Sequence, residues 1–171
     1  YNNTILSIDL SPDGRWLASS SQDHIIRLWE MSTGTCEKTF PKQPNQITCV
    51  AFDATGQWLV MGGLDRTITL WDITSSECLQ TFEGHTDWVA SVKVSPNRQL
   101  LASGSHDQTV KLWDAYSGEC LRTLQGHTHR IKAIAFHPQG NQLASASYDS
   151  SVKLWNVETG DCMRTLQGHT V

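Results

Sequence analysis

The chain contains 171 residues, and its 13 Lys and Arg against 17 Asp and Glu give a formal net charge of -4. That length is enough for one domain that buries well over half of its unfolded surface, while the acidic balance disfavours nucleic acid and anionic membranes as partners. No apolar run approaches the roughly 18 residues of a membrane span, and residues 1–10 lack the basic start and long apolar stretch of a signal peptide. These features predict a cytoplasmic protein with no membrane contact.

Four residue types recur in steps of 42 residues along the whole chain. The recurring residues are Trp29, Trp71, Trp113 and Trp155, Asp23, Asp65, Asp107 and Asp149, Thr39, Thr81, Thr123 and Thr165, and Cys36, Cys78, Cys120 and Cys162. Periods of about 40 to 45 residues are typical of propeller blades and of some helical arrays. The period divides the chain into repeats at 1–42, 43–84, 85–126 and 127–168. Residues 169–171 start a fifth repeat, because Gly168, His169 and Thr170 match Gly126, His127 and Thr128.

Each repeat contains short runs that are rich in β-branched and aromatic residues. In order along the third repeat these runs are 88–94 (WVASVKV), 100–105 (LLASGS), 109–114 (TVKLWD) and 119–124 (ECLRTL), with turn-forming residues between them. Short strands that are separated by turn signals about every 8 to 12 residues indicate an antiparallel β meander. The runs are too short, and too rich in Ser, Thr, Gly and Val, for helices. The predicted fold class is therefore all-β, with four blades of four-stranded antiparallel sheet.

Residues 84–114 (GHTDWVASVKVSPNRQLLASGSHDQTVKLWD) and 126–156 (GHTHRIKAIAFHPQGNQLASASYDSSVKLWN) resemble WD repeats in their Gly-His opening, turn Asp and closing Trp-Asp or Trp-Asn. The resemblance covers the whole chain. It implies a WD-repeat β-propeller, in which four-stranded blades surround a channel and serve as a docking platform without catalysis. The regular repeats also resemble those of bacterial-type signalling and sensor proteins, which join them to nucleotide-binding ATPases and kinases.

The resemblance also implies a buried polar network in each complete blade. Its members are His85, Ser103, Asp107 and Trp113 in the third repeat, and His127, Ser145, Asp149 and Trp155 in the fourth. A Ser, a His and an Asp in one unit would suit an acyl-transfer enzyme, but a set that is copied from blade to blade is expected of a folding element. In the first repeat Tyr1 takes the His position, and in the second Met61 replaces the Ser. We therefore expect the first two blades to be less rigid.

No motif indicates a cofactor, a metal or a catalytic residue. Neither a Gly-x-x-x-x-Gly-Lys loop nor a Gly-x-Ser-x-Gly elbow is present. His127 and His129 form a His-x-His pair, but no third ligand is apparent. The recurring cysteines belong to separate repeats, so their Cα atoms should lie beyond the roughly 7 Å that a disulfide requires. We expect them to be reduced and half-buried.

In the resembling family, partners bind the narrow face formed by the connections that enter the innermost strands and by the turns that carry the Asp. The matching positions give a candidate partner-binding set of Gln46, Leu64, Trp88, His106, Arg130, Lys132 and Tyr148. Trp, Tyr and Arg dominate interface energies, so we expect a protein or peptide partner here. In the alternative interpretation, Trp88 only caps the channel mouth and the two cations are solvated. Trp16 and Trp58 share one position and are expected to cover an outer apolar layer, with a second partner site as the alternative.

The predicted function is a non-catalytic protein–protein interaction scaffold or sensor region. The alternative is an accessory propeller of a larger enzyme, a nucleotide-binding signalling ATPase or kinase, whose catalytic part lies outside these residues. Three arrangements of the blades stay open at this point. They are a segment of a longer propeller chain, a half-ring that closes by self-association, and a closed ring of four blades.

Overall fold

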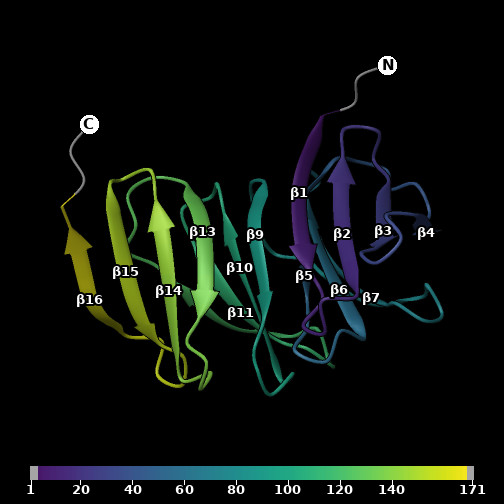
Figure 1. Cartoon of the computed structure of the whole chain (residues 1–171). Helices are drawn as coiled ribbons and strands as arrows, with labels where there is room; N and C mark the ends of the chain where they lie inside the picture. Colours follow the sequence, from purple (N-terminus) through teal and green to yellow (C-terminus); the bar gives the residue numbers. More distant parts are fainter. Residues whose placement is uncertain (1–3, 169–171) are drawn as a thin grey trace.

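The computed structural model describes residues 4–168 and contains sixteen strands, with no helix in that range (Figure 1). The first two sheets consist of β1 (Ile5–Leu10), β2 (Trp16–Ser21), β3 (Ile26–Glu30) and β4 (Cys36–Thr39), and of β5 (Ile47–Phe52), β6 (Trp58–Gly63), β7 (Ile68–Asp72) and β8 (Cys78–Phe82). The other two consist of β9 (Val89–Val94), β10 (Leu100–Ser105), β11 (Val110–Asp114) and β12 (Cys120–Leu124), and of β13 (Ile131–Phe136), β14 (Gln142–Ser147), β15 (Ser151–Asn156) and β16 (Cys162–Gln167).

Each sheet is a meander in which every strand pairs antiparallel with the next strand in the chain. The prediction of an all-β fold with four four-stranded antiparallel blades is therefore confirmed. The first strands of neighbouring sheets lie side by side, and side chains bond across the junctions: Ser7 Oγ accepts the Val50 N–H at 3.2 Å, and Ser91 Oγ accepts the Ile134 N–H at 3.2 Å. The four sheets form a partial ring (Figure 1).

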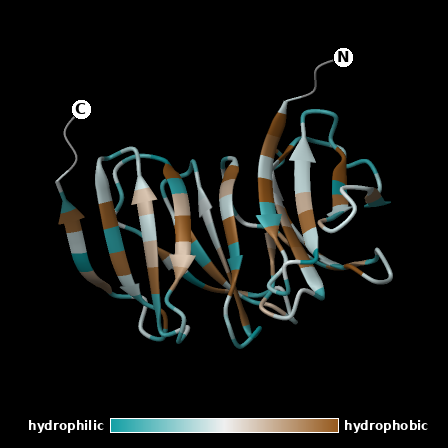
Figure 2. Ribbon diagram, in the orientation of Figure 1, coloured by the Kyte–Doolittle hydropathy of each residue, from teal (hydrophilic) through white to brown (hydrophobic). Residues whose placement is uncertain are grey.

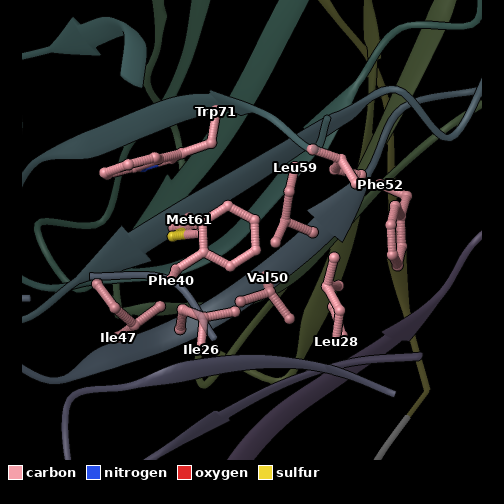
Figure 3. Close-up of a cluster of buried hydrophobic side chains, with 11 residues drawn as sticks. Ile26, Leu28, Phe40, Ile47, Val50, Phe52, Leu59, Met61 and Trp71 are labelled. Carbon is pink, nitrogen blue, oxygen red and sulfur yellow. The ribbon is translucent and has the colours of Figure 1, made fainter. Parts of the chain in front are cut away.

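The apolar core consists of three clusters, one at each junction between sheets. In the first, Figure 3 shows Ile26, Leu28 and Phe40 of the first unit meeting Val50 and Met61 of the second. Phe40 also meets the Trp71 ring edge-on, with 5.8 Å between centroids. Burial of each large apolar side chain contributes about 2 to 3 kcal/mol. Adjacent sheets therefore hold each other in place, and each sheet has two different apolar faces.

The first sheet and the last sheet each leave one of these apolar faces uncovered. Ile8 on β1 is 61% exposed, whereas Val50, its equivalent on β5, is 5% exposed. Leu166 on β16 is 48% exposed, whereas Phe40, its equivalent after β4, is 1% exposed. Figure 2 shows apolar residues along β1. The first and last sheets therefore do not pack on each other, which disagrees with a closed ring of four blades.

Within residues 4–168, no helix is long and apolar enough to cross a membrane.

Candidate functional site

Four polar side chains of the third sheet form a hydrogen-bonded chain from a turn to the middle of the blade. His85 Nδ1 lies 2.7 Å from Asp107 Oδ2, and His85 Nε2 lies 2.7 Å from Ser103 Oγ. The Trp113 indole N–H donates to the same hydroxyl at 2.8 Å. The turn itself orients the carboxylate: Asp107 Oδ1 accepts the Thr109 N–H at 2.9 Å across Gln108, whose φ is 72°, and this leaves Oδ2 free for the imidazole.

The chemistry of the donors fixes the direction of each bond. A carboxylate only accepts, so His85 donates from Nδ1, and the Nε2 of a neutral imidazole then accepts the Ser103 hydroxyl proton. The Ser103 oxygen in turn accepts from the indole, so every member is satisfied. Burial raises the pKa of Asp107, but the hydrogen bonds from His85 and Thr109 outweigh it and hold that pKa well below its ordinary value. The network therefore favours the ionised carboxylate.

The fourth sheet repeats the same arrangement. His127 lies 2.7 Å from both Asp149 Oδ2 and Ser145 Oγ, and the Trp155 indole N–H donates to Ser145 at 2.8 Å. These bonds have the connectivity of a catalytic triad, but a substrate must also reach the hydroxyl. Ser103 is fully buried and Ser145 nearly so. Neither hydroxyl is open to a molecule from solvent, which favours a folding role for both networks.

The first two sheets satisfy the tryptophans differently. Trp29 donates to Ser19 at 2.8 Å, and Asp23 forms an ion pair with Arg27 at 2.8 Å. The expected role of Tyr1 lies outside the described residues. In the second sheet Met61 is buried where Ser stands elsewhere, and the Trp71 indole donates instead to Thr69 Oγ1 at 2.9 Å. Sequence reasoning missed Thr69, because its position is Arg27, Lys111 and Lys153 in the other repeats.

Six of the seven candidate partner-binding residues meet in pairs at the end of the sheets where each first strand begins, and the seventh, Lys132, is exposed on β13. The residue before each turn Asp donates its backbone N–H to the residue before the first strand. The pairs are Leu64 to Gln46 at 3.0 Å, His106 to Trp88 at 2.8 Å and Tyr148 to Arg130 at 3.1 Å. The first pair is half-buried, whereas Trp88, Arg130 and Tyr148 are exposed. The backbone ladder thus brings together side chains that are 18 residues apart.

Two aromatic side chains dominate this face, and each is held by a neighbour. Trp88 is 46% exposed and stacks at a tilt on His106, with 5.4 Å between ring centroids. Tyr148 is 51% exposed, and the Arg130 guanidinium lies over its ring at 4.4 Å. Burial lowers the pKa of His106, and the positive charges of Arg130 and Lys132 lower it further, against the opposing effect of the Asp87 carboxylate. The third and fourth sheets therefore contribute to one electrostatic environment. We call Trp88, His106, Arg130, Lys132 and Tyr148 the aromatic face.

The remaining motifs show no built site. His127 is engaged in its network, and among residues 4–168 no group of three His, Cys, Asp or Glu is placed to hold a metal ion. The cysteines at the four repeated positions are free and exposed rather than half-buried, because they lie on the outermost strand of each sheet. Cys49 is buried, and burial raises the pKa of its thiol to about 12. An unreactive thiol is the consequence.

The four-stranded sheets and the repeated His-Ser-Asp-Trp network define a WD-repeat β-propeller. A family model described as IFT122 first beta-propeller matches residues 46–171, and one described as WD domain, G-beta repeat matches residues 1–30. The first match covers well over half of the chain. The chain therefore belongs to the β-propeller family that this model describes.

Short segments of the chain are similar to eukaryotic proteins. U3 small nucleolar RNA-associated protein 21 of Saccharomyces cerevisiae is 47% identical over 36 residues, which are 21% of this chain and 4% of the relative. Ribosome biogenesis protein bop1 of Danio rerio is 46% identical over 39 residues, which are 23% of this chain and 5% of the relative. Protein HIR1 of Candida albicans is 45% identical over 40 residues, 23% of this chain and 4% of the relative. The matches thus span about one repeat and a small fraction of each relative.

These relatives change one expectation. The resemblance to bacterial-type signalling and sensor proteins finds no support, because the matching proteins are eukaryotic and two of them are named for ribosome biogenesis or for a small nucleolar RNA. The coarser expectation of a WD-repeat propeller is confirmed by both family models. WD repeats are typical of protein-interaction scaffolds, and none of the relatives named above carries the name of an enzyme.

Proposed function

We propose that this chain is a non-catalytic protein-interaction segment whose partner docks on the aromatic face. The observation that carries the proposal is the pair of exposed rings, Trp88 and Tyr148, on neighbouring sheets at the same end of the strands. Both rings are already oriented, one by His106 and the other by Arg130. A partner therefore orders few side chains when it binds, and each ring offers a large apolar area beside a polar group.

The cations of the fourth sheet favour a partner that presents a carboxylate beside an apolar group. Arg130 and Lys132 both belong to this face, while the Asp87 carboxylate, which accepts the Trp88 backbone N–H, restricts the positive region to the Tyr148 side. Complementary charge would raise the association rate and fix the orientation of the partner. Gln46 and Leu64 continue the face toward the second sheet and form its half-buried edge. The acidic net charge of the chain favours protein over nucleic acid as the partner.

The experiment is a binding measurement with a protein that co-purifies with this chain. Trp88→Ala together with Arg130→Ala should weaken binding by about 2 kcal/mol or more, as central aromatic and Arg anchors do. Trp16→Ala is the matched control, because Trp16 lies outside the aromatic face and should leave binding unchanged. Normal binding by the double variant, with loss in Trp16→Ala, would place the site elsewhere. A filter-binding titration with single-stranded RNA serves as the second arm and should detect no complex at physiological salt.

The compartment is a separate part of the proposal. The composition predicts the cytoplasm, whereas the names of two relatives refer to ribosome biogenesis and to a small nucleolar RNA. We propose the nucleus as the compartment to test first, because the names of these two relatives are more specific than the composition of the chain. Fluorescence imaging of the tagged protein in cells decides between the two. Exclusion of the tagged protein from the nucleus would restore the cytoplasmic prediction.

A second copy of the chain is the other partner that the exposed surfaces support. The uncovered face of the first sheet and that of the last sheet correspond to the two unlike faces that pack together at each internal junction. Two copies could therefore pack the last sheet of one on the first sheet of the other, as a head-to-tail interface.

A further inference from the structure

A cavity of about 690 Å³ opens on the outer side of the junction between the third and fourth sheets. Its apolar lining consists of Leu100, Leu112, Leu121 and Val157. The turns after β9 and β13 form its rim, so the cavity lies at the opposite end of the strands from the aromatic face. We call it the outer groove. Its volume falls in the range of small-molecule and side-chain binding sites, about 300 to 1,000 Å³.

The same place one junction earlier is filled by the chain itself. Between the second and third sheets, the Arg98 guanidinium lies over the Trp58 ring at 3.8 Å, and the Tyr116 ring meets Trp58 edge-on at 5.5 Å. Arg98 takes a positive φ of 62°, at a turn position where the other three repeats have glycine. Its Nε lies 2.9 Å from Asp53 Oδ2 in an ionic contact. The chain thus forms an aromatic contact at this junction despite backbone strain.

All three of the filling side chains are replaced in the outer groove. The repeat places Leu100 where Trp58 stands, Gly140 where Arg98 stands, and Glu158 where Tyr116 stands. The equivalent cavity between the first two sheets keeps an indole, Trp16, and measures about 410 Å³. The outer groove is the larger of the two cavities, which is the direction expected when a leucine side chain replaces an indole, and the difference exceeds what that exchange alone provides. The outer groove therefore lacks an aromatic group that its neighbour contains.

We propose that the outer groove binds an aromatic side chain, of indole size, from a short segment of a partner protein. The groove continues the packed junction between the third and fourth sheets, because Leu112 and Val157 belong to both the apolar cluster and the groove lining. The lining has one positive residue, Arg122, and one negative residue, Glu158, so it suits an uncharged occupant. This site is separate from the aromatic face and does not depend on its role.

The rim of the groove provides polar groups for the backbone of the bound segment. Four exposed carboxamide side chains line it, those of Asn97, Gln99, Gln139 and Asn141. A carboxamide both donates and accepts, so it matches the N–H and C=O groups of a peptide. An apolar floor with carboxamides along its edge thus suits a peptide with one aromatic anchor better than it suits a charged ligand.

N-acetyl-L-tryptophanamide is the probe that tests the proposal, because it combines an indole with two peptide groups. Amide chemical shifts of the 171-residue chain are followed by NMR during a titration with the probe. We expect saturable shifts around Leu100, Leu121 and Gly140, and an affinity for N-acetyl-L-leucinamide that is at least about tenfold lower. Absence of shifts, shifts confined to Trp88 and Tyr148, or equal binding of the leucine probe would each overturn the proposal.

Two variants of the same slot provide the controls. Leu100→Trp restores the residue of the first two repeats, so it should fill the groove, keep the fold and abolish the shifts. Trp16→Leu makes the reverse exchange between the first two sheets and should create a second set of shifts around Glu37 and Gly56. Unchanged binding in the first variant, or no new site in the second, contradicts the assignment. Shifts at the groove that appear without the probe as protein concentration rises would identify a second copy as the occupant and would also overturn it.

Discussion

The Trp71 indole donates its hydrogen to Thr69, two residues away on the same strand, whereas the tryptophans of the other three sheets donate to a serine on the neighbouring strand. The strand partner in the second sheet is Met61, whose apolar side chain is buried against Phe40 and the rest of the first core cluster. The loss of the serine is therefore compensated locally: the indole stays satisfied, but its link to the turn that carries Asp65 is gone.

This compensation predicts a specific cost at a residue that the repeat does not mark. Thr69→Val keeps the shape of the side chain but leaves the indole N–H of the buried Trp71 without its acceptor, so the free energy of unfolding should fall by about 1 to 2 kcal/mol. Urea denaturation measures the change. Thr74→Val is the control, since Thr74 is exposed and surface changes usually stay within about 0.5 kcal/mol. Equal stability of both variants would show that Thr69 contributes nothing to the second sheet.

The third sheet allows the folding role and the catalytic role of the network to be separated. Ser103→Ala removes both the proton that His85 Nε2 accepts and the acceptor of the Trp113 indole, so stability should fall by about 2 kcal/mol or more. Hydrolysis of p-nitrophenyl acetate should not change. Ser19→Ala is the matched control, because it removes only the acceptor of the Trp29 indole N–H. The loss of stability in Ser19→Ala should therefore be smaller than in Ser103→Ala. Loss of hydrolysis at full stability would reverse the assignment.

The sequence alone predicted the features that repeat, and it missed those that depend on a single contact. The recurrence of Trp, Asp, Thr and Cys was sufficient to predict four antiparallel sheets, because each blade solves the same packing problem with the same residues. Thr69 was invisible because no other repeat uses that position for the indole. The outer groove could not be predicted, because its volume results from three exchanges on two different repeats that meet only in the folded chain. The exposure of Cys36 and its equivalents depends on which strand is outermost.

Acid should weaken the third sheet through Asp107. Its pKa is held below the ordinary value in the folded chain by His85 and Thr109, so the folded state binds protons less readily than the unfolded state does. The stabilising contribution is therefore complete above about pH 4 and decreases as the pH falls further. Urea midpoints between pH 7 and pH 3 should fall more steeply for the wild type than for Asp107→Asn, which is less stable at neutral pH. An equal decrease of the urea midpoint for the two proteins between pH 7 and pH 3 would contradict this linkage.

Arg98 and Asp53 should show strong thermodynamic coupling. Arg98→Gly relieves the strain of φ 62°, worth about 1 kcal/mol, but it leaves the fully buried Asp53 carboxylate without its cation. Breaking a buried pair costs about 3 to 5 kcal/mol, so the single variant should lose about 2 kcal/mol or more. Asp53→Ser introduces the residue that stands at this position in the first and third repeats. There the hydroxyl of Ser11 or Ser95 accepts a backbone N–H of the turn.

The double variant Asp53→Ser with Arg98→Gly should therefore recover most of the stability that Arg98→Gly loses. The measurement is a double-mutant cycle by urea denaturation, in which the coupling energy should exceed about 1 kcal/mol. Additive losses would show that the Arg98 contact with Asp53 is incidental, and that Arg98 is held only by its stacking on Trp58.

Self-association of the chain should be head-to-tail, because its two uncovered faces are unlike. Ile8 belongs to one face and Leu166 to the other, and both side chains are largely exposed, so Ile8→Glu and Leu166→Glu should leave each monomer folded. Sedimentation velocity should show concentration-dependent assembly of the wild type and a monomer for either variant. In a mixture of the two variants, the intact face of each meets the intact face of the other, so a single dimer should form. A mixture that stays monomeric, or a variant that still dimerises alone through two like faces, would rule out the head-to-tail interface.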